Sequence, residues 1–170
     1  MFSEKNNRMS AIKVEVTPVA DSDFEELADL RVAAMRESLE RVGRFDPVRA
    51  RARLRSSFKP EHTGFIAFEG ARVGFYAVIP SPEGLRLDHL YVHPDFQNRG
   101  IGRAVLQMIL AEADARGVAV LVGALKESAS NRFYQRHGFA LVSESEWDNY
   151  YLRPAAAVPG KSTAGILPKQ

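Results

Sequence analysis

The chain has 170 residues, of which 45% are hydrophobic and 26% charged, a composition typical of one globular domain with a sizeable core. Its formal net charge of +2 is too small to indicate a nucleic-acid partner, and the lack of cysteine excludes disulfides, a thiol nucleophile and zinc–thiolate sites. No histidines form an i, i+4 pair on an expected helix, so we expect no metal. The polar start and the absence of a long apolar run predict a cytoplasmic protein that does not bind membranes.

The spacing of apolar residues and the turn residues between them predict alternating helices and strands. In chain order, we expect a strand at 13–17, helices at 21–42 and 46–58, strands at 63–68, 72–79 and 85–92, a helix at 101–115, a strand at 118–122, a helix at 129–136, and strands at 139–142 and 147–152. Asp21 or Ser22 is expected to cap the first helix, and Gly117 to end the third. Residues 80–84 are expected to form a loop. The pattern predicts an α+β fold around one mostly antiparallel sheet.

The most informative segment is the glycine-containing turn Gln97-Asn98-Arg99-Gly100-Ile101-Gly102, which joins an expected strand to an expected helix. The free N–H groups and the positive dipole end at the start of such a helix form a site for a phosphate or pyrophosphate. Arg99 and Arg103 add positive charge there. A dinucleotide fingerprint would need a third glycine where Val105 stands, and a P-loop would need Lys-Ser/Thr after Gly102. A plain tight turn before a capped helix remains the alternative.

Two sequence motifs together carry a family resemblance. The first is Leu90-Tyr91-Val92-His93-Pro94-Asp95-Phe96-Gln97-Asn98-Arg99-Gly100-Ile101-Gly102, and the second is Asn131-Arg132-Phe133-Tyr134-Gln135-Arg136-His137-Gly138-Phe139. They resemble the acetyl-CoA motif and the later Phe-Tyr-x-x-x-Gly-Phe motif of the GNAT N-acetyltransferase superfamily. The resemblance covers residues 12–154, between a flexible leader at 1–11 and a flexible tail at 155–170. It implies the GNAT fold, a mixed, mostly antiparallel sheet with splayed central strands flanked by helices.

The resemblance implies that acetyl-CoA is the co-substrate. The N–H groups from Gln97 through Gly102 would hold the pyrophosphate, and the pantetheine arm would pair with backbone at an open sheet edge. The coenzyme-binding residues would be Leu90, Tyr91, Val92, Gln97, Asn98, Arg99, Gly100, Ile101, Gly102 and Arg103. Tyr134 matches the family tyrosine that acts as general acid, and a phenol pKa near 10 suits a proton donor to a thiolate. Alternatively, Tyr134 only packs between helix and sheet.

The sequence leaves the general base open. Arg86 stands where histone-acetylating relatives have a glutamate base, and Asp88 and His89 follow on the same strand. Because successive side chains alternate, only one of that pair faces the cleft unless a bulge intervenes. Either one takes the amine proton directly or through water, or is only a solvated carboxylate or a packed imidazole. Glu127 replaces a family asparagine that contacts the coenzyme, and Asn131 lies only three residues before the tyrosine.

The region that selects the acceptor in this superfamily is rich in arginine here. Residues 31–59 carry nine cationic and three acidic side chains, a balance of +6. This charge is either a solvated helical face with Glu–Arg pairs or a wall that recognises a carboxylate- or phosphate-bearing amine. The segment Trp147-Asp148-Asn149-Tyr150-Tyr151 either lines a small-molecule cleft or belongs to a closing strand.

We therefore expect an N-acetyltransferase that acts on a small-molecule amine or an exposed protein amine by direct attack. The alternative is an acyl-CoA-binding sensor or partner-binding domain with weak or lost catalysis, which the departures at Arg86 and Glu127 favour. A nucleic-acid-binding domain is disfavoured because no aromatic residues are interleaved with the charge. A homodimer is possible by analogy with relatives.

Overall fold

The computed structural model describes residues 11–157. They form a seven-stranded sheet in the order β1-β2-β3-β4-β5-β7-β6, which confirms the expected α+β class. The strands are β1 (Glu15–Pro18), β2 (Thr63–Phe68), β3 (Ala71–Ser81), β4 (Gly84–Val92), β5 (Ala119–Leu125), β6 (Ala140–Glu144) and β7 (Asp148–Arg153). The helices are α1 (Phe24–Arg41), α2 (Pro47–Ser57), α3 (Ile101–Arg116) and α4 (Ser130–Arg136), with 3-10 helices η1 (Asp21–Asp23), η2 (Pro60–His62) and η3 (Pro94–Phe96).

The predicted leader and tail lie almost wholly outside the described residues. Near the end of the described residues, the Ala156 N–H donates to the Asp114 carboxylate at 2.8 Å. From residue 11 to residue 157, no helix combines the length and the apolar character that crossing a membrane requires.

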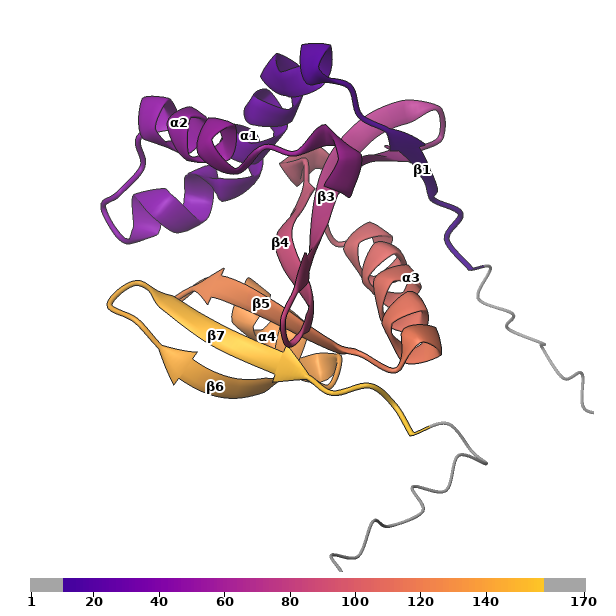
Figure 1. The fold of residues 1–170 in the computed structure, drawn as a ribbon. Helices are drawn as coiled ribbons and strands as arrows, with labels where there is room; N and C mark the ends of the chain where they lie inside the picture. The colour runs from indigo at the N-terminus through magenta and orange to yellow at the C-terminus, as the bar shows by residue number, and fades with distance from the viewer. Residues whose placement is uncertain (1–10, 158–170) are drawn as a thin grey trace, which may run out of the picture.

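The sheet consists of two halves that separate in the middle. β4 and β5 are parallel and pair only from Gly84↔Ala119 to Leu87↔Val122. All other neighbouring strands are antiparallel. Beyond Leu87 and Val122 the two strands diverge, so residues 88–92 and 123–125 have open backbone on the facing sides within the described chain. Figure 1 shows β1–β4 and β5–β7 separating toward one side of the molecule.

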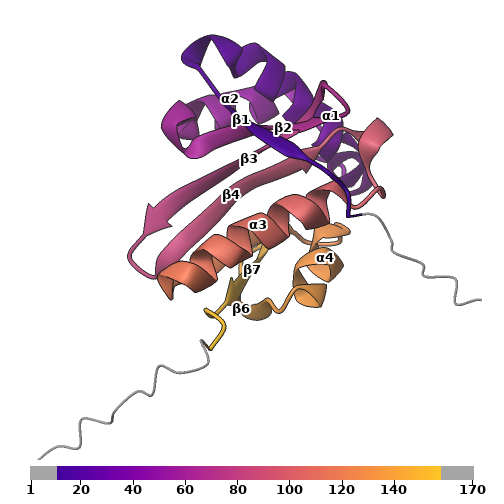
Figure 2. The ribbon, with the colours of Figure 1, turned by 90° about the vertical axis from the view of Figure 1, so that its right-hand side faces the viewer.

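Helices cover the two faces of the sheet and enclose two cores. α1 and α2 lie on one face, where Leu27 and Leu54 pack with Phe65 of β2. α3 and α4 lie on the opposite face, where Leu106 of α3 packs with Ile66 of β2. Figure 2 shows α3 running alongside β4, on the side of the strands away from α1 and α2. Consecutive residues of β2 thus serve different cores, as the alternation of strand side chains requires.

A β-bulge at Asp88 changes which face β4 presents. Ala77 pairs with His89 and Val78 pairs with Leu87, so Asp88 is the extra residue on the β4 strand. Before the bulge, Leu87 packs on the α3 side. After it, His89 faces the α1–α2 side, next to Phe75 at a ring-centroid distance of 5.8 Å. The bulge therefore redirects the side chains of β4 where the sheet opens.

Three local expectations are corrected. Asp21 and Ser22 do not cap α1, because they lie in η1 and α1 begins at Phe24. The loop expected at 80–84 is reduced to a turn at 82–83, because Pro80 and Ser81 extend β3 and β4 begins at Gly84. Pro80 is tolerated because the pairing of β3 with β2 ends at Ala77, so β2 needs no N–H from Pro80. β5 runs three residues beyond the expected end at 122, into the open part of the sheet.

Candidate active site

Two cavities meet where β4 and β5 separate. A larger one, of about 750 Å³, lies between the helical layer of α1 and α2 and the strands β4, β5 and β7. A smaller one, of about 150 Å³, lies between the open edges of β4 and β5 and extends toward α4. Asp88, Tyr91, Val122 and Gly123 border both cavities. The two spaces therefore share a junction at the bulge.

The glycine-containing turn leaves a run of backbone donors free. Asn98 and Gly100 have left-handed φ angles of 61° and 82°, and the first helical bond of α3 runs from the Ala104 N–H to the Gly100 carbonyl at 3.0 Å. The N–H groups of residues 101–103 consequently have no helical acceptor. The Gln97 N–H, expected to be part of this cradle, instead donates to the Pro94 carbonyl at 3.3 Å. The backbone donors without an acceptor thus begin after Gln97.

Leu90 and Val92 present open backbone at the edge of β4 that faces β5. Leu90 and Val92 pack against the core under α3, and their backbone pairs with β3 on one side only. The Gln97 side-chain amide donates to the Val92 carbonyl at 2.8 Å, which ties the turn to the end of β4. The Arg99 guanidinium donates to the Asp95 carbonyl at 3.2 Å.

Tyr134 lies on α4 at the wall of the smaller cavity. Its ring is 6% exposed and packs edge-on against Phe133 at 5.3 Å and Phe139 at 5.4 Å, so the second motif forms one aromatic cluster. Burial, with a smaller contribution from Tyr91, raises the pKa of the Tyr134 hydroxyl well above its usual value. The hydroxyl therefore remains protonated at neutral pH, as a proton donor must.

Asp88 is placed by the bulge at the junction of the cavities. Arg86 holds it with two donors, Nε and a terminal nitrogen that is 3.1 Å from the carboxylate. This hydrogen bond is also the main reason that the pKa of the Arg86 guanidinium is raised. Arg86, which replaces the glutamate of some relatives, thus orients a neighbouring carboxylate.

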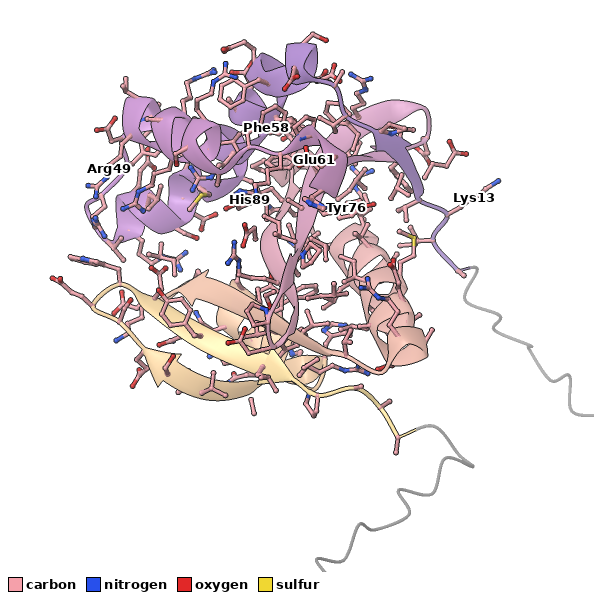
Figure 3. All side chains as sticks on the ribbon, in the orientation of Figure 1. Lys13, Arg49, Phe58, Glu61, Tyr76 and His89 are labelled. Carbon is pink, nitrogen blue, oxygen red and sulfur yellow. The ribbon has the colours of Figure 1, made fainter. Side chains whose placement is uncertain are left out.

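His89 of β4 faces the larger cavity, on the side of the sheet that α1 and α2 cover (Figure 3). Its ring lies 5.6 Å from that of Tyr91, and neither ring nitrogen has a hydrogen-bond partner among the described residues. Burial, and to a smaller extent the nearby cation of Arg31, lowers the pKa of the imidazole to about 4. Because the bulge intervenes, Asp88 and His89 both border the cleft, which the alternation rule alone would forbid.

Asn131 is a structural hub. Its amide donates to the carbonyls of Leu125 and Ser128, each at 2.9 Å, and its oxygen accepts from Asn149 at 2.9 Å and the Tyr151 hydroxyl at 2.8 Å. These bonds occupy the amide fully and fasten α4 to β5 and β7.

The aromatic segment near the C-terminus divides between the cleft and the core. All three aromatic residues border the larger cavity, but Trp147 and Tyr150 are about two-fifths exposed, whereas Tyr151 is 2% exposed and belongs to the core under α3. Gly123 leaves room for the Tyr150 ring, since a β-carbon there would lie 3.3 Å from it. Both sequence interpretations of this segment therefore hold, for different residues.

Comparisons with known proteins agree with this geometry. A family model described as an acetyltransferase (GNAT) domain matches residues 60–141, from η2 into β6, and includes both motifs. No curated protein matches the chain at a significant level. Among solved structures, the PaiA N-acetyltransferase of Thermoplasma acidophilum in complex with coenzyme A is 14% identical with a TM-score of 0.69, and the match covers 84% of this chain and 99% of that one.

Two further structures have the same fold. An acetyltransferase of Thermus thermophilus is 20% identical with a TM-score of 0.67, and the match covers 86% of this chain and 99% of that one. The ribosomal-protein-S18-alanine N-acetyltransferase of Escherichia coli is 16% identical with a TM-score of 0.64, and the match covers 87% of this chain and 98% of that one. Residues 60–141, which contain both motifs, therefore belong to the acetyltransferase (GNAT) domain family, and the chain has the fold of these acetyltransferases.

Proposed function

We propose that the protein transfers an acetyl group from acetyl-CoA to a primary amine of a small molecule or an exposed protein amine. The junction of the two cavities at the opening between β4 and β5 is the observation that supports this most strongly. One cavity leads toward the turn before α3 and the other opens under α1 and α2. A donor and an acceptor would therefore enter through different cavities and meet beside Asp88 and Tyr91.

The residues around the smaller cavity fit coenzyme A. The N–H groups after Gln97 and the dipole of α3 would bind the pyrophosphate, with Arg99 and Arg103 adding positive charge. The open backbone of Leu90, Tyr91 and Val92 would pair with the amides of the pantetheine arm, as a strand pairs with a sheet edge. When bound, acetyl-CoA supplies a thioester whose carbonyl carbon is open to attack by an amine.

The side chains at the junction would manage the protons of this reaction. As the amine nitrogen forms the new C–N bond and the C–S bond breaks, Asp88 would take the amine proton, directly or through water. The Tyr134 hydroxyl would give its proton to the departing thiolate. We assign the base role to Asp88 rather than His89, because Asp88 borders both cavities and the imidazole pKa of about 4 makes His89 a weak proton acceptor.

The Tyr134→Phe variant tests this proposal. Thiol release from acetyl-CoA over a panel of amines should fall by about 10²- to 10⁴-fold, the usual contribution of a general acid, while acetyl-CoA still raises the melting temperature. The matched control is Tyr76→Phe, because Tyr76 is a half-buried tyrosine of β3 that borders neither cavity at the junction.

Each outcome separates the candidate functions. Undiminished thiol release by Tyr134→Phe would show that Tyr134 only packs. Stabilisation by acetyl-CoA without thiol release for any amine would favour the sensor alternative. No stabilisation by acetyl-CoA would contradict both.

A further inference from the structure

The arginines of α1, α2 and their connection fall into two sets. The first set lies outside the larger cavity and is already neutralised or stacked. Arg36 pairs with Glu40 at 2.9 Å, Arg41 with Glu37 at 3.0 Å, Arg51 with Glu25 at 2.8 Å, and Arg55 lies over the Phe24 ring at 3.6 Å. The helical ion pairs expected from the sequence account for Arg36 and Arg41, whereas Arg51 pairs across from α2 to α1 and Arg55 stacks on a ring.

The second set lines the larger cavity and consists of Arg31, Arg44, Arg49 and Arg53. None of their guanidinium groups has a carboxylate partner among the described residues. Arg44 lies over the Trp147 ring at 4.0 Å, and Arg49 lies at the outer end of the helical layer (Figure 3). The cavity wall formed by α1 and α2 is therefore positively charged, and its guanidinium groups have no carboxylate partners among the described residues.

The acidic side chains of the cavity leave this charge in place. Asp46 accepts the Arg49 backbone N–H at 3.1 Å as the cap of α2, and Asp88 is held by Arg86. Asp148 stands on β7, on the opposite wall from the helices. A bound anion is thus the partner that the helical wall lacks.

Arg31 is the buried member of this set and lies beside Tyr91. It is only 8% exposed, and its guanidinium carbon lies 5.9 Å from the centroid of Tyr91, which borders both cavities. One terminal nitrogen donates to the Ala50 carbonyl, while Nε has no acceptor among the described residues. A buried cation without a counter-charge is costly, and a ligand anion would offset that cost.

We propose that the acceptor is a small primary amine that carries a carboxylate, and that Arg31 binds this carboxylate. This inference rests on the proposed acetyl transfer and names its substrate class. A single buried guanidinium matches one planar, two-oxygen anion, and Arg49 and Arg53, both exposed, supply attraction at the entrance. A cavity of about 750 Å³ suits a small molecule. The positive wall also lowers the pKa of a bound amine, which favours the uncharged nucleophile.

Matched acceptors test the inference through thiol release with the full chain. The panel contains an α-amino acid, a β-amino acid, the carboxamide and the decarboxylated amine of each, and an aminoalkyl phosphate. We expect kcat/KM for an amino acid to exceed that for its carboxamide by about 10- to 100-fold, as for hydrogen bonds to a charged group. Arg31→Met should abolish this preference, and Arg31→Lys should restore part of it.

The control variant is Arg51→Gln, which also removes one positive charge from the helical layer, but from a residue outside the cavity. It should keep the preference for the amino acid over its carboxamide. Because Arg31 is buried and its replacement can disturb folding, Arg49→Gln and Arg53→Gln provide a second test on exposed residues. Each should lower kcat/KM for the amino acid severalfold without changing that for the decarboxylated amine.

Binding to the CoA-saturated protein, measured by calorimetry, separates this inference from the proposed function. Binding of the amino acid but not its carboxamide, lost in Arg31→Met, supports the inference even if no amine releases thiol and the proposed function fails. Equal use of charged and uncharged amines would overturn the inference while acetyl transfer stands. A preference for the aminoalkyl phosphate would also overturn it.

Discussion

At the scale of single residues, the buried imidazole of His89 makes the free energy of unfolding depend on pH. Its folded pKa of about 4 lies below the value near 6.5 expected in the unfolded chain, so between these values the unfolded state binds more protons. The free energy of unfolding should therefore decrease as pH falls from 6.5 toward 4, by about 3 kcal/mol if the full shift applies. This direction is opposite to that of a histidine stabilised by an acidic partner.

The His89→Phe variant should flatten this pH dependence, because a phenyl ring fills the space beside Phe75 and Tyr91 without a titrating group. Urea unfolding of both proteins at several pH values between 4 and 7 measures the slope. A slope that persists in the variant would assign the acid sensitivity to other groups.

The aromatic motif indicates the position of Tyr134 in the chain, and the structure places this residue at the wall of the smaller cavity. The choice among neighbouring candidates depends on contacts that the sequence does not show. Choosing between Asp88 and His89 required the bulge, and no residue type in β4 marks an inserted residue. Arg31 is one of eight arginines with similar neighbours in sequence. Its burial depends on how α1 packs against α2, which is a tertiary property.

At the scale of elements, the start of α3 depends on the backbone of Gly100. Its φ of 82° is left-handed, and an added β-carbon would lie 2.8 Å from Cδ1 of Ile12. Gly100→Ala should lower stability by about 1 kcal/mol and distort the adjacent free N–H groups. We expect a decrease in the melting temperature of about 2–4 °C and weaker binding of acetyl-CoA.

The control is Gly70→Ala in the β2–β3 turn, where φ is 80° and no atom lies within 4 Å of an added β-carbon. It should lower the melting temperature similarly while leaving acetyl-CoA affinity unchanged. Equal affinities for the coenzyme in all three proteins would argue against a backbone cradle at Gly100.

The elements themselves follow from local signals, with exceptions where tertiary contacts decide. β2 matches its expected bounds, and α3 differs by one residue, because turn residues and apolar spacing mark both. The sequence does not indicate that β5 continues past residue 122, because residues 123–125 are held by pairing with β7 rather than by their own propensity. Pro80 likewise lies in β3 because of pairing with a neighbouring strand. A proline is excluded from a strand only where a neighbouring strand needs an N–H donor at that position.

At the scale of the whole molecule, the two halves of the sheet are joined by only a short ladder. Four residue pairs connect β4 and β5, and the remaining backbone on the facing sides is open. A bound pantetheine arm would occupy one open edge and bridge the halves. The protein is thus expected to gain rigidity on binding its coenzyme mainly at this opening.

Hydrogen exchange with and without acetyl-CoA tests this expectation. Amides of residues 88–92 that point away from β3, together with those of residues 98–103, should exchange at least about tenfold more slowly in the complex, because each gains an acceptor or loses access to water. Amides in the β2–β3 ladder, which is complete without ligand, serve as the internal control and should change little. Uniform slowing across the sheet would indicate only global stabilisation. Protection confined to the larger cavity would show that the coenzyme binds there and not at the opening between β4 and β5.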